Sequence, residues 1–557
     1  MKAIVGLAGV LMMSLSCESS TPEPAHAPVA AKARVDVPLF SGLGTHSRKI
    51  TTASPMAQKY FDQGLAFLYG FNHDEAIRAF RKAAEIDPKC AMAQWGIALA
   101  NGPHINFPML PPDRAKAAHE ALARAKQHVA NATDVERGLI DALSQRYHTP
   151  EPEDRKALDQ AYADAMRALY RAHRDDADVG ALFAEAMMDL RPWDLWTVDG
   201  KAQPGTEEIV TTLETILAKA PNHPLANHLH IHAVEASRSP ERAVASADRL
   251  RSLQPALGHM VHMPSHIDVR LGHWDAAIKA NEAAIAADAR YAAQRPNQGF
   301  YRIYMAHNHH LLTFAAMMTG KQELAIRNIR EMVAGVPPDW LKENASFADG
   351  YVAMPFEVLM RFGEWEEILA APEPPSYLPL SRAIRRYARG VAYAATGDLD
   401  HARTEQRAFL QAKTMVSKGA TFGNNAAADL LAIAEHVLDG EIQFREGHHE
   451  QGILQLFTAA ALEDKLRYDE PPDWILPVRH ALGAALLKAD MPKEAEAVYR
   501  VDLAKLPNNV WSLHGLARSL RLQKKDTDAR AVEADLAKAS SGSDIHLTSS
   551  CMCLPGI

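Results

Sequence analysis

The chain has 557 residues, of which 47% are hydrophobic and 23% are charged, a composition typical of a globular protein with several domains or one long repeat array. Its net charge of −8 excludes a broad basic surface, so the composition argues against nucleic-acid binding. Aromatic residues make up only 7% of the chain and no alternating apolar run indicates a sheet, so we expect an all-α fold.

Residues 1–17 have the features of a bacterial export leader. Lys2 precedes the apolar stretch AIVGLAGVLMMSL, which is too short to span a bilayer as a stable helix. The SLSC stretch at its end resembles the lipobox of bacterial lipoproteins, in which the cysteine, here Cys17, is lipidated and becomes the first residue. Ser14 departs from that pattern, because leucine or valine is usual there. Ordinary secretion with an incidental Cys17 is the alternative.

Residues 18–49 begin with small, polar and proline-rich sequence, which predicts a flexible tether. Together with the leader, it predicts an exported protein in the periplasm or cell envelope, with the lipid anchor as its only membrane attachment. The chain has four cysteines, too few for an exported protein that relies on a disulfide scaffold. We therefore expect its stability to come from packing.

The stretch YFDQGLAFLYGFNHDEAIRAFRKAAEIDP has the small, alanine, aromatic and proline positions of a helix–turn–helix repeat. These residues are Gly64, Ala76, Phe80, Ala83 and Pro88. A second set is Gly483, Ala495, Tyr499 and Pro507, and a looser third set is Gly390, Tyr393 and Ala402. In these residues the chain resembles the tetratricopeptide-repeat (TPR) family. The resemblance implies an all-α, TPR-like superhelical solenoid over residues 50–540, in which each unit covers the apolar edge of its neighbour.

Two long insertions interrupt the repeats, at residues 101–113 and 191–205. Both are rich in proline, glycine and aromatic residues, where a short turn between helices would suffice. Insertions of this kind are often lids or walls of a functional site. The alternative is that they are tolerated surface loops.

Nine of the 26 histidines lie in three short segments, NHLHIHAVE, GHMVHMPSH and AHNHH. In the register that the TPR resemblance implies, spacings of three and four place seven of them on the stripe that lines the concave groove. These seven are His228, His232, His259, His262, His266, His307 and His310. His230 and His309 fall at packing positions instead. Pro264 falls inside a helix in this register, so we expect a kink or a late helix start there.

We interpret the histidine stripe as a transition-metal site. Clustered imidazoles repel one another when protonated, and a metal removes that cost by coordinating neutral rings. The nitrogen-rich ligands suit copper or zinc, which we rank nearly level, with iron behind; Met260 and Met263 favour Cu(I). Glu235 is a candidate ligand or catalytic general base towards metal-bound water. The alternatives are a polar ligand groove without metal, and histidines that share no site.

Residues 541–557 form a tail outside the repeat pattern that carries Cys551 and Cys553. In an oxidising compartment this Cys-x-Cys is a thiol pair, a ligand pair or a disulfide. The tail reaches the groove only if the superhelix curls. Another segment, YDEPPDWILP, places Glu470 and Trp474 as candidates for a groove wall.

Two functional classes follow from these patterns. The first is an exported metalloprotein, either an oxidoreductase or a hydrolase, whose groove is the active site. The second is a non-catalytic scaffold that binds peptide or protein partners in the groove, as most TPR proteins do. The sequence has no motif for nucleophilic serine, nucleotide or dinucleotide chemistry.

Overall fold

The computed structural model describes residues 37–554. The predicted leader, Cys17 and residues 18–36 of the predicted tether lie outside the described residues. The chain divides into two units, Met1–Pro38 and Leu39–Ile557, and all helices described below belong to the second. None of the helices within residues 37–554 has the length and apolar character needed to cross a bilayer.

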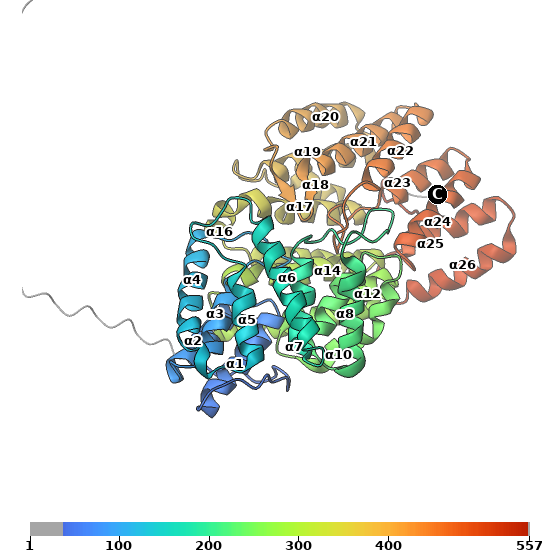
Figure 1. Ribbon diagram of the computed structural model, residues 1–557. Helices are drawn as coiled ribbons and strands as arrows, with labels where there is room; N and C mark the ends of the chain where they lie inside the picture. Colours follow the sequence, from blue (N-terminus) through green and yellow to red (C-terminus); the bar gives the residue numbers. More distant parts are fainter. Residues whose placement is uncertain (1–36, 555–557) are drawn as a thin grey trace, which may run out of the picture. The chain divides into compact units, whose positions relative to one another are not determined.

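The second unit is all-α, as predicted (Figure 1). Its first half contains α1 (Pro55–Tyr69), α2 (His73–Ile86), α3 (Ala91–Ala100), α4 (Pro112–Gln127), α5 (Asp134–Ser144), α6 (Lys156–Ala172), α7 (Ala177–Met188), α8 (Thr206–Lys219), α9 (Pro224–Val234), α10 (Val244–Leu253), α11 (Gly258–His262), α12 (Pro264–Arg270) and α13 (Trp274–Gln294). Its second half contains α14 (Arg302–Met318), α15 (Gln322–Ala334), α16 (Pro338–Glu343), α17 (Ala345–Phe362), α18 (Trp365–Ala370), α19 (Pro379–Ala395), α20 (Leu399–Lys413), α21 (Ala427–Arg445), α22 (His449–Glu463), α23 (Val478–Lys488), α24 (Pro492–Lys505), α25 (Val510–Leu522) and α26 (Asp526–Ala539).

Few other regular elements occur in residues 37–554. The short 3-10 turns are η1 (Val129–Asn131), η2 (Pro240–Ala243) and η3 (Gly299–Tyr301). The strands β1 (Thr421–Phe422) and β2 (Asn425–Ala426) pair antiparallel as a small hairpin. Most helices pack chiefly on the next helix along the chain, as α1 does on α2 and α21 on α22.

The glycines of the repeat pattern explain how closely these helices pack. A Cβ on Gly64 in α1 would lie 2.4 Å from the ring of Phe80 in α2, and a Cβ on Gly96 in α3 would lie 2.6 Å from the same ring. Phe80 is therefore clamped between two helices that approach it only because both lack a side chain there. Tyr499 is held in the same way between Gly483 and Gly515. The helix–turn–helix units thus pack as the TPR pattern predicts.

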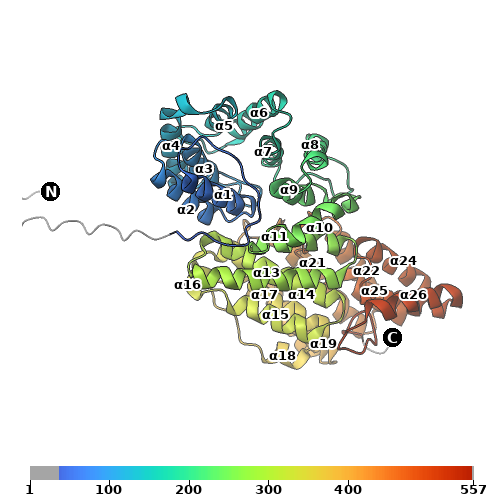
Figure 2. The ribbon, with the colours of Figure 1, turned by 90° about the horizontal axis from the view of Figure 1, so that it is seen from below.

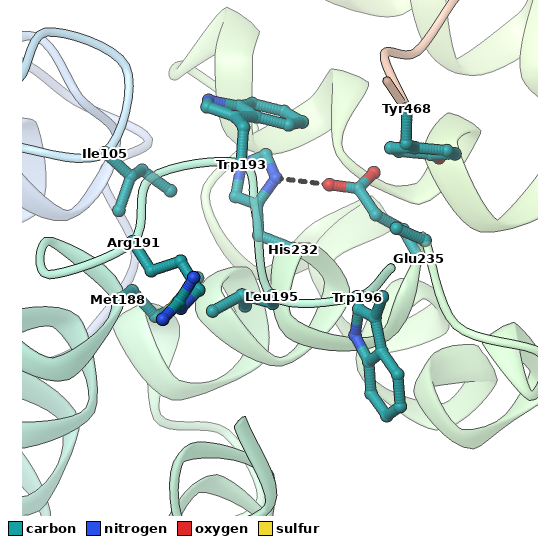
Figure 3. A pocket seen from close by; sticks show the side chains of 10 residues that line it. Ile105, Met188, Arg191, Trp193, Leu195, Trp196, His232, Glu235 and Tyr468 are labelled. Atoms are coloured by element: carbon teal, nitrogen blue, oxygen red, sulfur yellow. Dashed lines mark hydrogen bonds and ion pairs between the residues drawn. The ribbon is translucent and has the colours of Figure 1, made fainter. Parts of the chain in front are cut away.

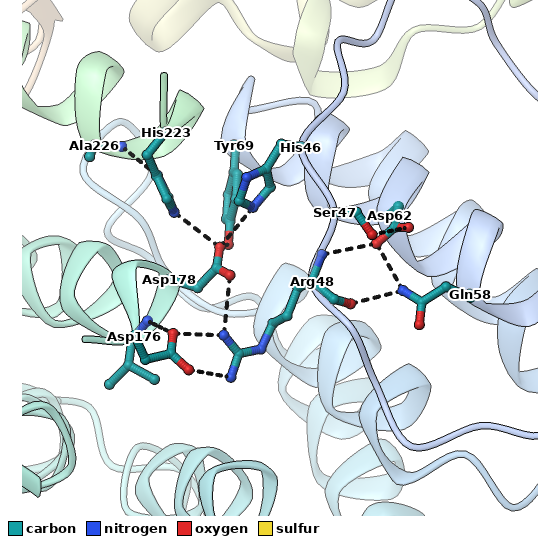
Figure 4. A network of polar contacts seen from close by, with 11 residues as sticks. His46, Ser47, Arg48, Gln58, Asp62, Tyr69, Asp176, Asp178, His223 and Ala226 are labelled. Atoms are coloured by element: carbon teal, nitrogen blue, oxygen red, sulfur yellow. Dashed lines mark hydrogen bonds and ion pairs between the residues drawn. The ribbon is translucent and has the colours of Figure 1, made fainter. Parts of the chain in front are cut away.

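Residues 39–49, which the sequence placed in the flexible tether, are held against the helices. Phe40 N–H donates to Gln63 Oε1 at 2.8 Å. Arg48 donates to both carboxylate oxygens of Asp176 at 2.8 and 3.0 Å (Figure 4). A buried or partly buried charge pair of this geometry fixes the backbone that carries it. The ordered structure therefore begins before residue 50.

The predicted interruption at Pro264 is present. α11 ends at His262 and α12 begins at Pro264, whose ring occupies the first turn where a missing N–H costs nothing. Figure 2 shows α9, α10, α11 and α13 following one another, and α11 also contacts α14. The three histidine segments therefore lie on neighbouring helices.

Candidate metal centre

The histidine segments meet in one continuous cluster of rings. His228 and His232 project from α9, His259 and His262 from α11, His266 from α12 and His307 from α14. We call these six the histidine cluster. Successive ring centroids are 5.0 Å apart for His228–His232, 4.9 Å for His228–His259, 5.7 Å for His259–His262, 4.7 Å for His262–His266 and 4.7 Å for His262–His307. Histidines separated by up to 79 positions in the sequence are thereby brought together.

Glu235 joins two helices of the cluster. It caps the C-terminus of α9, and its side chain is 1% exposed. One carboxylate oxygen accepts from Nδ1 of His232 at 2.8 Å, and the other accepts from Nδ1 of His266 at 2.5 Å. Burial by itself raises the pKa of Glu235, but His266 and His232 outweigh it and lower the pKa to about 2.

This arrangement does not favour the general-base role that the sequence suggested for Glu235. Both of its oxygens accept an imidazole N–H, but each keeps a second lone pair, so Glu235 can still join His232 and His266 as a metal ligand. A carboxylate with a pKa near 2 is a weak general base at neutral pH. Glu235 is placed instead to orient the two rings, as carboxylates behind metal-bound histidines do.

Two further rings are oriented from outside the cluster. Nδ1 of His228 lies 2.7 Å from the backbone carbonyl oxygen of Tyr69, and Nδ1 of His262 lies 2.7 Å from Oδ1 of Asn281. The Asn281 amide nitrogen donates to Ala277 O, which leaves its oxygen facing His262. A carbonyl or carboxylate oxygen can only accept, so Nδ1 carries the proton in all four rings. In a neutral ring the Nε2 atom then carries a lone pair.

The Nε2 atoms of the cluster converge. Nε2 of His262 lies 2.7 Å from Nε2 of His266, and Nε2 of His228 lies 3.1 Å from Nε2 of His259. Nε2 of His232 is buried and has no hydrogen-bond partner. Two lone pairs at such distances repel each other, so a proton or a cation has to lie between them. The pair His262–His266, in which both Nδ1 atoms hold their protons, is therefore arranged to surround positive charge, whereas a neutral His259 can supply the proton between its Nε2 and that of His228.

The protonation states fit this geometry. Burial lowers the pKa values of His228, His259, His262 and His307 well below the usual value, which keeps these rings neutral at pH 7. Burial also acts to lower the pKa of His266, but Glu235 reverses that effect and the net shift is upward. His266 is thus the ring that holds a proton when no cation is present, and it shares that proton with His262.

His310 stands apart from the other six predicted ligands. Its ring lies 6.2 Å from that of His307 and faces Tyr351 at 5.7 Å and Phe422 at 6.2 Å. Both of its nitrogens are buried without a hydrogen-bond partner, and burial lowers its pKa to about 3. His310 therefore extends the row of rings but is not among the nitrogens that gather closely.

The two histidines assigned to packing positions point elsewhere. His230 Nδ1 lies 3.0 Å from Ser246 Oγ, and His309 Nδ1 lies 2.7 Å from Asn328 Oδ1. Both contacts join the histidine helix to the next helix along the chain. These two rings hold helices together and take no part in the cluster.

Five of the six cluster residues are buried and His307 is partly buried, whereas the TPR register placed them on an open groove. His228, His259, His262 and His266 are each at most 1% exposed. Part of the cover is Phe71, whose ring lies 4.3 Å from that of His228 and stacks on those of His232 and His259. Phe71 adopts φ 57°, a left-handed conformation that costs a residue other than glycine about 1–2 kcal/mol. The turn between α1 and α2 bears this strain where it holds the ring over the histidines.

Both insertions form a wall beside the cluster (Figure 3). A small pocket reaches His232 and Glu235, and its other sides include Ile105 from the first insertion and Trp193 and Trp196 from the second. The Trp193 indole lies 5.3 Å from the His232 ring, edge to face. The insertions therefore act as a wall of the site, one of the two alternatives that their sequence left open.

The segment YDEPPDWILP contributes to the same wall through a residue that the sequence did not single out. Tyr468 also lines the pocket (Figure 3). Glu470 is buried, and burial raises its pKa to about 8 although His266 and Arg270 oppose the shift. Trp474 lies at a different cavity, beside the C-terminal tail.

Sequence patterns did not reveal Phe71 or His104. His104 comes from the first insertion, stacks on His73 with centroids 3.9 Å apart, and lies 5.5 Å from the Phe71 ring. Its position in a proline-rich insertion was the only feature of the sequence that pointed to a role for His104. No feature of the sequence pointed to Phe71, because its role depends on the conformation of a turn.

A second group of candidate ligands, His46, Asp178 and His223, has a structural explanation (Figure 4). Nδ1 of His223 accepts from Ala226 N–H at 3.1 Å, so the proton of a neutral ring is on Nε2, which donates to Asp178. A nitrogen that holds its proton cannot coordinate. Asp178 also accepts from Arg48 and from the Tyr69 hydroxyl. This network attaches residues 39–49 to α7 and α9.

The C-terminal tail is docked away from the histidine cluster. Ser550 O accepts from Arg361, and Ser550 Oγ donates to His480 O at 2.8 Å and pairs with the Tyr499 hydroxyl at 2.6 Å. Cys551 and Cys553 form a disulfide, one of the three states that the sequence left open. The tail therefore packs on α17, α23 and α24 and does not reach the cluster.

The helices and the cluster define a class: an all-α tetratricopeptide-type solenoid with a buried multi-histidine site. No family model and no curated sequence matches the chain. Among solved structures, it is similar to a human IFIT1 dimer with m7Gppp-AAAA, at 11% identity and a TM-score of 0.33, covering 88% of this chain and 92% of that one. It is also similar to yeast Tom70, at 12% identity and a TM-score of 0.27, covering 88% and 91%. A third is the APC/C hetero-tetramer Cut9–Hcn1, at 13% identity and a TM-score of 0.31, covering 87% and 76%. Likeness at this level carries no functional argument, and the helix pairs themselves define the fold.

Proposed function

We propose that this protein is an exported metalloprotein whose histidine cluster binds a first-row transition metal, copper or zinc ahead of iron. One observation carries the proposal. Four buried rings have an acceptor at Nδ1, which leaves Nε2 to bind an ion, and Nε2 atoms lie 2.7 Å apart in His262–His266 and 3.1 Å apart in His228–His259. Imidazole nitrogens oriented by partners behind them are the ligands that copper and zinc prefer.

The group His262, His266 and His307 is the best-formed ligand set. One nitrogen of each lies within 4.8 Å of the others. Two ligands about 2.1 Å from one ion can be at most ~4.2 Å apart, so a small movement of these side chains completes a three-histidine site. A three-coordinate ion keeps an open position for water or substrate, which is the arrangement of catalytic sites.

An enzymatic role, as an oxidoreductase or a hydrolase, is supported by the pocket beside the cluster. Trp193, Trp196 and Tyr468 give it aromatic walls, and His232 and Glu235 close its inner end. Arg191 also lines it and forms an ion pair with Asp194 at 3.1 Å. The cavity volume is about 20 Å³, room for about one water molecule, so water or a ligand of that size fits beside the cluster.

Metal analysis of untagged protein tests the proposal. After removal of bound metal, the protein should take up Cu(II) or Zn(II) at micromolar concentration at pH 7.5. The double variant His262→Asn/His266→Asn should take up less metal than the wild type and keep its circular dichroism. The matched control replaces two exposed histidines, His401→Asn/His448→Asn, and should bind as the wild type does.

The repeat fold also supports a binding or scaffold role, in which peptide or protein partners replace the metal as ligand. The metal experiment separates the two proposals. If the untagged wild type binds no metal at micromolar concentration, the scaffold is the better account. The buried histidines are then interior hydrogen-bonding residues.

A further inference from the structure

The six histidines of the cluster fall into two groups of three. The first group is His262, His266 and His307, and the second group is His228, His232 and His259. Within each group, one nitrogen from every ring lies within 4.8 Å of the other two. The two groups share no histidine, so each has a complete set of three imidazole ligands.

The groups are built alike. In each one, two rings are oriented by an outside acceptor and the third is not. In the first group, Asn281 orients His262 and Glu235 orients His266. In the second group, Tyr69 O orients His228, Glu235 orients His232, and Nδ1 of His259 has no hydrogen-bond partner.

Glu235 connects the two groups. Its carboxylate gives one oxygen to a ring of each, so a single side chain sets the orientation of both. The ring centroids of His232 and His266, one from each group, are 5.5 Å apart, and those of His259 and His262 are 5.7 Å apart. The groups are therefore direct neighbours with no layer of other side chains between these rings.

We infer that the cluster is a binuclear centre, with one transition-metal ion in each three-histidine group. This inference rests on the metal-binding proposal and extends it from one ion to two. Six imidazoles in two groups, linked by the shared acceptor Glu235, exceed what one tetrahedral ion needs. Two ions in adjacent three-histidine sites would each keep an open position for water or another small ligand.

The second group has features that a merely structural histidine set lacks. Nε2 of His232 is buried and has no hydrogen-bond partner, although a buried polar atom left unpaired is destabilising. Phe71, held at φ 57°, covers the three rings and excludes water from them. A metal ion supplies the missing partner to Nε2 of His232.

Copper stoichiometry tests the inference. The untagged full chain is stripped of metal, loaded with Cu(II) in the presence of a weak competing ligand, desalted and analysed for copper per chain. The wild type should hold two equivalents. The variant His228→Asn/His259→Asn lacks two ligands of the second group and should hold one equivalent of copper. The variant His262→Asn/His307→Asn lacks two ligands of the first group and should also hold one equivalent. Both variants keep His232 and His266, the partners of Glu235, and circular dichroism checks their fold. The control His401→Asn/His448→Asn should hold two.

Electron paramagnetic resonance adds a test of proximity. Two neighbouring Cu(II) ions couple, so the signal per copper should be weaker in the wild type than in either one-copper variant. A wild type that saturates at one equivalent overturns the inference and leaves the metal proposal intact. The binuclear inference is also overturned if either folded variant loses all its copper or if the control loses one equivalent. It is overturned as well if the signal per copper is equal in the wild type and the one-copper variants. A wild type that holds no copper overturns the metal proposal itself.

Discussion

Replacing Glu235 with glutamine tests the orienting role of this carboxylate at minimal change in size. Glutamate accepts from His232 at 2.8 Å and from His266 at 2.5 Å. Glutamine has one acceptor oxygen and one donor NH2 group, so it can serve one ring only. The other ring then meets a donor, and its proton shifts from Nδ1 to Nε2. That ring stops being a ligand, because the nitrogen that faces the metal now holds a proton.

The expected loss of metal affinity follows from the number of orienting contacts that the substitution removes. One of two orienting contacts is lost, and loss of such a partner typically weakens metal binding 10- to 100-fold, or about 1.4–2.7 kcal/mol. The dissociation constant of Glu235→Gln should therefore rise by that factor. The assay is competition with a chromophoric chelator at pH 7.5. Glu214→Gln is the matched control, because Glu214 lies beside His230 at 3.6 Å but outside the cluster.

Two results would refute the reasoning about Glu235. The first is an unchanged dissociation constant in Glu235→Gln protein with normal circular dichroism. The second is an equal loss of affinity in Glu214→Gln. Either result would mean that the carboxylate does not set the orientation of the histidine rings.

Three other predictions address packing, pH and export. Gly64→Ala places a Cβ 2.4 Å from the Phe80 ring and should lower the free energy of unfolding by about 1–3 kcal/mol, whereas Gly419→Ala, with open space around it, should change it little in urea titrations. Burial raises the pKa of Glu357 to about 8, above its usual 4.5, so the free energy of unfolding should fall as pH rises from about 4.5 to 8, by up to roughly 5 kcal/mol. Glu357→Gln should flatten that pH dependence between pH 5 and pH 8. An unchanged pH dependence in the variant would contradict this prediction. Cys17→Ala should move the protein from the membrane to the soluble envelope fraction, and wild type recovered in the cytoplasm with its leader intact would contradict export.

The repeat pattern predicted the helical packing because TPR packing depends on local spacing. Gly64 and Phe80 lie on consecutive helices of one unit, and the distance between them along the chain is fixed by helix length and a short turn. The break at Pro264 was predictable for the same reason, since proline in a helix acts on its own turn. The sequence left the disulfide in the tail as one of three alternatives, because helical periodicity does not determine whether two nearby cysteines form a bond.

The sequence alone determined which histidines lie on one face of each helix, because a period of 3.6 residues places positions three and four apart side by side. Only the tertiary structure decided what these faces meet. The acceptor of His228 is Tyr69 O, 159 positions away, and that of His262 is on α13. The division into two groups, the shared orientation through Glu235 and the cover by Phe71 depend on how distant helices pack. Helical periodicity carries no information about that packing, since it describes one helix at a time.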